Sequence, residues 1–193
     1  MMIKICGITN LEDARAAVDG GARALGFNFW PGSPRYITRD AAREMIAKLP
    51  AAVWKVGVFV DEEPEKVAEI ARETGLDIVQ LHGQETGADF PRGLRVWKAL
   101  RIGARFDRGV LGQYPAEALL LDGASNGVSF DWTLAAGIHG KVIVAGGLDA
   151  ANVAEAIREA RPWGVDACSR LESTPGKKDH VKMAQFLKAA LSA

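Results

Sequence analysis

MIKICG, residues 2–7, is the stretch from which the fold follows. It is a short apolar run that starts almost at the first residue, contains one lysine and ends on a thiol followed by a glycine. Such a run is typical of a buried strand, and the periodic pattern from Leu11 onwards predicts a helix. Cys6 therefore stands where a buried strand passes into a loop. We expect the other strands to gather around this one and Cys6 to act as a proton-transfer group.

Further apolar runs alternate with helical patterns along the whole chain. The predicted strands are residues 23–29, 53–60, 77–81, 94–100, 118–121, 141–145 and 164–167. The predicted helices start at residue 11, span 39–49, 63–74, 84–90 and 106–114, start again at 131, and span 150–160 and 179–191. Asn10, Thr38 and Asp149 are suited to cap helices, and Pro64 suits a first helical turn. The segments 84–90 and 106–114 are the weakest helices, and the second contains two glycines.

This alternation predicts a parallel sheet covered by helices, because the strands are apolar almost throughout. Two architectures fit, an open doubly wound sheet and a closed (β/α)8 barrel. The open sheet usually carries a glycine-rich dinucleotide fingerprint after its first strand, and residues 6–10, CGITN, do not match it. We therefore expect an α/β protein with a single compact (β/α)8 TIM barrel over residues 1–193 and a shortened or irregular fifth helix.

Composition restricts the function further. The 24 basic and 24 acidic residues balance, so no overall field attracts nucleic acid or an anionic membrane. No apolar run approaches the roughly 20 residues needed to span a bilayer, and a secretory signal is not apparent, so the expected location is cytoplasmic. The two cysteines and three histidines have no metal-ligand spacing. We expect neither a metal nor a nucleic-acid or membrane partner.

The active site of such a barrel lies at the carboxyl ends of its strands. The strand-end residues are Cys6, Asn28, His82, Lys98, Asp122, Gly146, Gly147, Cys168 and Ser169. Each has a plainer interpretation as well. A buried cysteine is more often an inert small hydrophobe, Asp122 precedes a glycine and can simply begin a turn, and His82 can be a satisfied histidine at the rim.

Two features of the chain indicate an anionic ligand. Barrels frequently bind phosphate with the loops after strands seven and eight, here Gly146–Gly147 and Ser169, where backbone N–H groups meet the anion. Arg35, between Pro34 and Tyr36, is either a solvated loop charge or a clamp for a carboxylate.

Ordered motifs along nearly the whole chain resemble those of the phosphoribosylanthranilate isomerase family. They are KICGIT (4–9), GFNFWPGSPRYI (26–37), KVGVF (55–59), QLHG (80–83), LLLD (119–122), FDW (130–132), AGGLDAANV (145–153), and GVD with ESTPGKKD (164–179). The resemblance implies a (β/α)8 barrel without cofactor or metal that isomerises N-(5-phosphoribosyl)anthranilate in tryptophan biosynthesis. The resemblance also implies a small-molecule substrate with a phosphate and a carboxylate, and we expect the protein to be a monomer or homodimer.

The resemblance also implies roles for individual residues. By position, Cys6 is the general base and Asp122 the general acid. Arg35, His82, Asn28 and Asp166 fall in the substrate site, with Arg35 on the anthranilate carboxylate. Gly146, Gly147, Ser169 and Arg170 fall in the phosphate-binding loops. For this chemistry Asp122 must carry a proton when Cys6 has lost its own, which requires a lowered pKa for Cys6.

Two loops depart from the family pattern. Residues 124–127, ASNG, replace the usual glycine-rich run, and the loop after Asp122 is short. Residues 168–172, CSRLE, replace the usual SSGVE, so Arg170 either obstructs the approach of a phosphate or adds a cation to it, and we favour the addition.

Cys6 and Cys168 end neighbouring strands of a closed barrel, so we expect their thiols to lie within several ångströms of each other. Oxidation should then trap Cys6. Two other functions stay open, a ring-closing lyase that uses Lys98 as its acid and a non-catalytic phosphosugar-binding barrel.

Overall fold

A closed barrel of eight parallel strands forms the centre of the protein, in a computed structural model that describes residues 1–103, 106–123 and 127–193. Each strand pairs with the next along the chain, and β1 closes the ring against β8. The strands are β1 (Met2–Ile5), β2 (Ala24–Asn28), β3 (Trp54–Phe59), β4 (Ile78–Leu81), β5 (Val96–Ile102), β6 (Ala118–Gly123), β7 (Lys141–Val144) and β8 (Gly164–Ala167). The predicted (β/α)8 barrel is confirmed.

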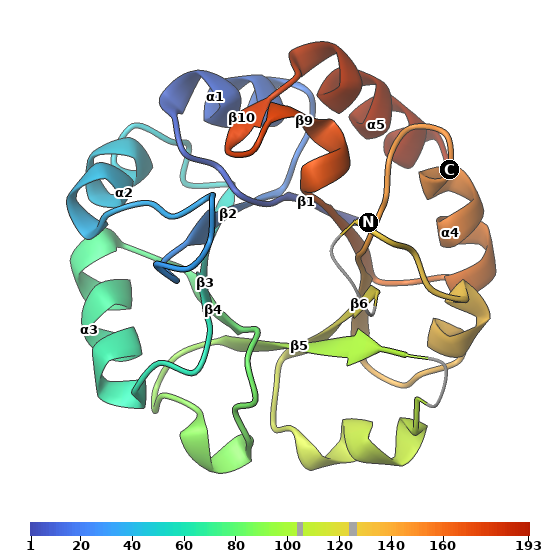
Figure 1. Ribbon diagram of the computed structural model, residues 1–193, viewed down its shortest axis with the longest axis horizontal. Helices are drawn as coiled ribbons and strands as arrows, with labels where there is room; N and C mark the ends of the chain where they lie inside the picture. Colours follow the sequence, from blue (N-terminus) through green and yellow to red (C-terminus); the bar gives the residue numbers. More distant parts are fainter. Residues whose placement is uncertain (104–105, 124–126) are drawn as a thin grey trace.

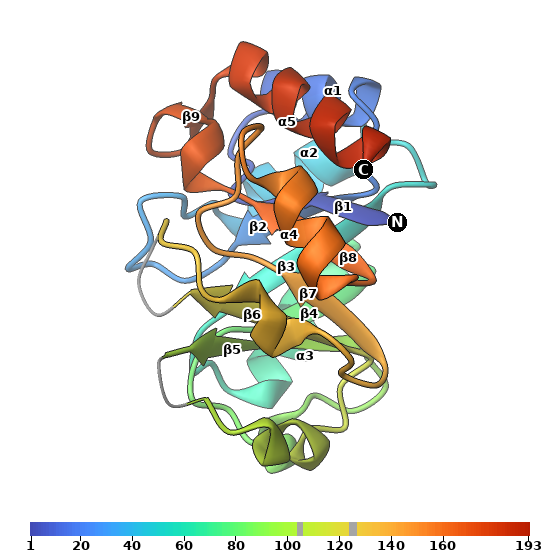
Figure 2. The ribbon, with the colours of Figure 1, turned by 90° about the vertical axis from the view of Figure 1, so that its right-hand side faces the viewer.

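Helices surround the barrel (Figure 1), and α1 and α5 pack against each other where the ring closes (Figure 2). The α-helices are α1 (Leu11–Asp19), α2 (Arg39–Ile46), α3 (Pro64–Thr74), α4 (Val153–Ala160) and α5 (His180–Ser192). In the described residues of the connections after β4, β5 and β6, the helical structure consists of short 3₁₀ turns, η1 (Gly87–Asp89), η2 (Arg108–Gln113) and η3 (Trp132–Ala135). The fifth helix is therefore irregular as predicted, and the sixth shrinks to a single short turn.

Local capping explains where most helices begin. The side chains of Asn10 and Thr38 accept hydrogen bonds from the amides of Asp13 and Ala41, and Pro64 opens α3. The prediction that Asp149 caps a helix from residue 150 is wrong, because α4 begins only at Val153, after Asn152. Asp149 instead accepts a hydrogen bond from Ala151 and so shapes the turn before the helix.

The chain after β8 contains a feature that the sequence did not suggest. A 3₁₀ turn, η4 (Ser169–Leu171), leads into the antiparallel strands β9 (Glu172–Thr174) and β10 (Lys177–Lys178). This β9–β10 hairpin lies beside the mouth of the barrel next to α1 (Figure 1). It brings two buried charges, Glu172 and Lys178, to the end of β8.

Alternation along the strands separates two layers of side chains. Ile3, Ile5 and their equivalents pack between the strands and the helices, whereas Met2 and the residues in step with it fill the barrel interior. Three tryptophans, Trp54, Trp97 and Trp163, pack together around the amino-terminal end, with ring centroids 5.9 to 6.1 Å apart. Side chains therefore fill the barrel at that end, and a site can form only toward the carboxyl ends of the strands.

Among the described residues, no helix is long and apolar enough to cross a membrane.

Candidate active site

The carboxyl ends of the strands surround a cavity of about 410 Å³. All ten residues assigned to the site from the sequence line it, namely Cys6, Asn28, Arg35, His82, Asp122, Gly146, Gly147, Asp166, Ser169 and Arg170. The reason is alternation: Met2 and Ala118 lie in the interior layer, so Cys6 and Asp122, in step with them, point inward one level higher. Seven of the ten were chosen as strand-end residues, whereas the roles of Arg35, Asp166 and Arg170 came from the family resemblance, and the fold brings both groups to one cavity.

Lys98 is the exception among the strand-end residues. Its ammonium is buried beneath the rim, where it donates to Glu85 Oε2 at 2.7 Å and to the carbonyl of Gly83 at 2.8 Å. Lys98 does not line the cavity. A lysine held in this way is a structural cation, so the ring-closing lyase loses its proposed acid.

Cys6 occupies a crowded position at the end of β1. A Cβ atom placed on Gly26 of β2 would lie 2.7 Å from Cys6 Sγ and 3.1 Å from Lys4 Cε. Only a glycine at residue 26 leaves room for both side chains. Below the thiol, the fully buried Lys4 donates to Asp166 Oδ1 of β8 at 3.0 Å. Cys6 thus sits on a buried ion pair.

The surroundings of Cys6 favour its thiolate. The neighbouring Cys168 thiol, as a hydrogen-bond partner, and the ammonium groups of Lys4 and Lys178 hold the pKa of Cys6 well below its ordinary value, against the opposing effect of burial. The pKa of Asp166 shifts the other way, to about 7, because burial and the negative charges of Cys6 and Asp122 outweigh the attraction of Lys4. The predicted lowering of the Cys6 pKa is therefore present in the fold.

Asp122 faces the cavity from the end of β6, next to a histidine. His82 Nε2 lies 3.4 Å from Asp122 Oδ2, and Gln80, which the sequence reasoning missed, places its amide nitrogen 3.4 Å from His82 Nδ1. A Cβ atom on Gly146 would lie 2.8 Å from Asp122 Oδ1, so the loop after β7 can approach the carboxyl closely because residue 146 is glycine. Gln80 belongs to the same inward face as His82, and that two-residue spacing is the signal that could have identified it.

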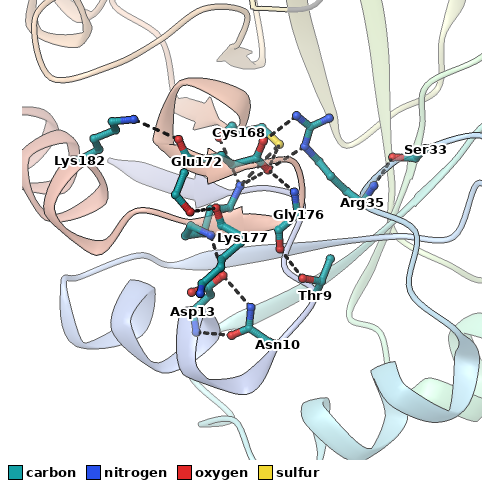
Figure 3. Close-up of polar contacts among 12 residues, drawn as sticks. Thr9, Asn10, Asp13, Ser33, Arg35, Cys168, Glu172, Gly176, Lys177 and Lys182 are labelled. Carbon is teal, nitrogen blue, oxygen red and sulfur yellow. Dashed lines mark hydrogen bonds and ion pairs between the residues drawn. The ribbon is translucent and has the colours of Figure 1, made fainter.

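Arg35 is held by a carboxylate of the protein itself, as Figure 3 shows. Its Nε and Nη2 atoms donate to Glu172 Oε1 and Oε2 at 2.8 and 2.7 Å. Lys178 Nζ, fully buried, donates to the same Glu172 Oε1 at 3.1 Å. Glu172 and Lys178 escaped the sequence reasoning because charged residues are ordinarily read as exposed.

The loops after β7 and β8 meet at one side of the cavity. Gly146 and Gly147 both adopt positive φ angles, 86° and 62°. Their amides donate no hydrogen bond to any acceptor in the described part of the chain. Arg170, on the neighbouring turn η4, is exposed, and its Nη1 atom lies 3.8 Å from Asp149 Oδ2. The arrangement has the two ingredients of an anion site, backbone donors and a nearby cation. Of the departures noted above, residues 124–126 lie outside the described residues.

The described residues contain no group of three histidine, cysteine or acidic side chains arranged to hold a metal ion. The absence of a cofactor or metal from the reaction stays a prediction.

Fold and site together define a (β/α)8-barrel enzyme in which a thiol and a carboxyl group face one cavity, beside an arginine and two glycines whose backbone N–H groups meet no acceptor among the described residues. A sequence model of the family described as "N-(5'phosphoribosyl)anthranilate (PRA) isomerase" matches residues 3–189. The chain belongs to this family, and the resemblance seen in the motifs is confirmed.

Individual relatives agree over the full length. The N-(5'-phosphoribosyl)anthranilate isomerase of Solibacter usitatus is 53% identical over 100% of this chain and 98% of its own. A crystal structure of phosphoribosyl anthranilate isomerase in complex with reduced 1-(o-carboxyphenylamino)-1-deoxyribulose 5-phosphate is 39% identical, with a TM-score of 0.89 and complete coverage of both chains. Monomers generated from the dimeric isomerase of Thermotoga maritima are 40% identical, with a TM-score of 0.90 and again complete coverage of both chains.

Proposed function

We propose that this chain is a phosphoribosylanthranilate isomerase of tryptophan biosynthesis. It converts N-(5-phosphoribosyl)anthranilate into 1-(2-carboxyphenylamino)-1-deoxyribulose 5-phosphate by general acid–base catalysis. The observation that carries the proposal is that Cys6 and Asp122, from opposite parts of the strand order, line one cavity beside a cluster of anion-binding groups.

The proposed reaction needs an acid and a base on different atoms. Asp122 protonates the ribose ring oxygen, and the ring opens to an iminium ion. Cys6, as the thiolate, then removes the proton on C2 to give an enolamine, which tautomerises to the ketone product. The lowered pKa of Cys6, caused first by the Cys168 thiol, supports its part as the base. No external oxidant or reductant is needed, because C2 is oxidised to the ketone as C1 is reduced within the same molecule.

The remaining site residues bind the two ends of the substrate. Gly146, Gly147, Ser169 and Arg170 hold the phosphate through backbone N–H groups and one cation. Arg35 binds the anthranilate carboxylate through the edge of its guanidinium that Glu172 leaves open, since Glu172 engages only Nε and Nη2. Asn28, His82 and Asp166 contact the sugar between them, with His82 next to the proposed acid.

Several broader properties are part of the same proposal. The whole of residues 1–193 works as one barrel domain, which the pairing of the first strand with the eighth supports. The balanced charge supports a cytoplasmic enzyme without a nucleic-acid partner. The relatives include both a dimer and monomers derived from it, and a monomer or homodimer is proposed here.

Complementation of a tryptophan auxotroph that lacks this isomerase tests the function, followed by turnover of the purified protein. Cys6→Ala and Asp122→Ala should each lower kcat by about 10²–10⁴-fold while binding of a product analogue persists. Glu44→Ala, on the exposed face of α2, is the matched control and should leave turnover unchanged. Binding of the analogue by the wild-type protein without turnover would favour the non-catalytic phosphosugar-binding barrel instead.

A further inference from the structure

Cys168 lies directly across the barrel seam from Cys6. The pairing of β1 with β8 matches Lys4 to Asp166 and Ile5 to Ala167, and the amide of Cys6 donates to the carbonyl of Ala167 at 2.9 Å. One step further along, Cys6 stands opposite Cys168. Lys4 and Asp166 form an ion pair inside the barrel, so Cys6 and Cys168, two residues on, share the same inward face.

The sulfur of Cys168 lies against Gly7, the residue that follows Cys6. A Cβ atom on Gly7 would lie 2.9 Å from Cys168 Sγ and 2.6 Å from Arg35 Cδ. Gly7 also has a positive φ of 73°, which turns the chain away from β1 directly after the proposed base. Both sulfurs therefore occupy space that glycines leave open, Cys168 above Gly7 and Cys6 above Gly26.

The β9–β10 hairpin fixes Cys168 from the side away from the cavity. Lys178 Nζ donates to the carbonyl oxygen of Cys168 at 3.2 Å and approaches its Sγ at 3.7 Å. Glu172 Oε1, at 3.9 Å, is a distant alternative acceptor for the single hydrogen of the Cys168 thiol. Since the side chain of Lys178 has no exposed surface, this cation has no solvent to stabilise it and must be satisfied by these neighbours.

The balance of charges around the two sulfurs favours one thiolate. Three cations face the pair, Lys4 from β1, Arg35 from the loop after β2 and Lys178 from β10. The two carboxylates in the same environment are Asp166, which pairs with Lys4, and Glu172, which pairs with both Arg35 and Lys178. With both carboxylates ionised one positive charge remains, and a single thiolate neutralises it.

We propose that Cys168 is a positioning residue for the isomerisation: its thiol donates a hydrogen bond to Cys6 Sγ and holds Cys6 as a thiolate aimed into the cavity. The proposal rests on the function proposed above, in which Cys6 is the base. Cys168 keeps the shared proton, because Cys6 and burial raise the pKa of Cys168 while Cys168 lowers that of Cys6. Lys178 and Glu172 keep the donor in place.

Three substitutions of Cys168 separate hydrogen-bond donation from the filling of space. Cys168→Ala and Cys168→Val both remove the donor, and the valine side chain restores the lost volume. Cys168→Ser keeps an O–H donor at the same place. If the hydrogen bond matters, alanine and valine should behave alike and serine should resemble the wild type more closely than either.

The decisive measurement is the pH dependence of the alkylation of Cys6 by iodoacetamide, followed on the peptide that contains Cys6. It reports the thiolate and needs no turnover. We expect the alanine and valine variants to shift the midpoint upward by about one pH unit or more, and the acidic limb of kcat/KM to move with it. Thermal unfolding of each variant shows that the comparison is made between folded proteins.

An alkylation midpoint that stays at the wild-type pH in both the alanine and valine variants would overturn the proposal. A serine variant that shifts as far as alanine would overturn it too, because the donor would then be irrelevant. Failure of the proposed isomerase function would look different, because the Cys6→Ala variant would then retain turnover. The alkylation of Cys6 in the Cys168 variants is a separate measurement and does not depend on that outcome.

Discussion

Arg35 and Glu172 form a two-bond ion pair at the mouth of the cavity, with Nε and Nη2 donating to the two carboxylate oxygens at 2.8 and 2.7 Å. The pair joins the loop after β2 to the β9–β10 hairpin. Glu172 also forms an ion pair with Lys178, so one carboxylate pairs with two cations, and the side chain of Lys178 is fully buried. Glu172 therefore links Arg35, the proposed substrate-binding residue, to Lys178, which donates to the carbonyl of Cys168.

Glu172→Gln should accordingly destabilise the fold. Both cations lose their counter-ion in a region sheltered from water, which costs about 3 kcal/mol or more of the free energy of unfolding. Urea unfolding of the two proteins measures it. Glu69→Gln is the matched control, since Glu69 also pairs with an arginine, Arg39, but is 46% exposed and should matter by less than about 1 kcal/mol. Equal effects of the two substitutions would contradict the prediction.

Gly26→Ala should impair catalysis by displacing the proposed base. The added methyl group would lie 2.7 Å from Cys6 Sγ and 3.1 Å from Cys6 Cα, so the thiol or the end of β1 must move. Misplacement of a reacting group by about 1 Å can cost about 10²-fold in rate, and overpacking costs about 1–3 kcal/mol of stability. Turnover and thermal unfolding measure the two effects.

Gly112→Ala provides the comparison for that substitution. A Cβ atom at Gly112, in η2, meets nothing within 4 Å, and we expect normal turnover. A Gly26→Ala variant with wild-type kcat would show that the position of the thiol is not critical.

Arg170→Gly should weaken substrate binding without changing the chemical step. Arg170 lines the cavity together with Gly146 and Gly147, and its Nη1 atom lies 3.8 Å from Asp149 Oδ2, so its charge stands next to the proposed phosphate site. We expect KM to rise about threefold to tenfold with kcat nearly constant, the pattern of lost uniform binding. Steady-state kinetics measures both, and Arg170→Lys, which retains the charge, should recover part of the loss. An unchanged or lower KM in the glycine variant would mean that the side chain obstructs the phosphate.

The barrel and the ring of site residues could be predicted because both depend on local patterns. Apolar runs such as residues 2–5 give the strands, and the first polar or reactive residue after each run gives the rim. Cys6 and Asp122 were found in this way, by their position at the ends of strands. The caps at Asn10 and Thr38 were equally local.

The buried charges could not be predicted because their partners are remote in the chain. Lys4 meets Asp166, and Lys178 meets Glu172 and Cys168, only after the barrel has closed and the hairpin has folded over its seam. Lys98 was misassigned for a related reason. Its place near the end of a strand predicts a residue at the rim of the cavity, but its ammonium group donates to the buried Glu85 and stays beneath the loop. The two-residue period that places Cys6 inward also places Lys4 inward, and that period was the available signal.

The Cys6 and Cys168 thiols should form a disulfide on mild oxidation and thereby block the proposed base. Neighbouring strands lie about 4.8 Å apart, within the Cα separation of about 4.4–6.8 Å that a disulfide spans, and the two cysteines stand opposite each other on the inward face. Diamide takes one hydrogen from each thiol, the S–S bond forms, and the diazene is reduced to a hydrazine. We expect activity to fall with a mass loss of two hydrogens and to return with dithiothreitol. The Cys168→Ser variant, which cannot close the bond, should keep its own starting activity under the same brief treatment. Equal sensitivity of wild type and Cys168→Ser would contradict the prediction, because oxidation would then act on Cys6 alone.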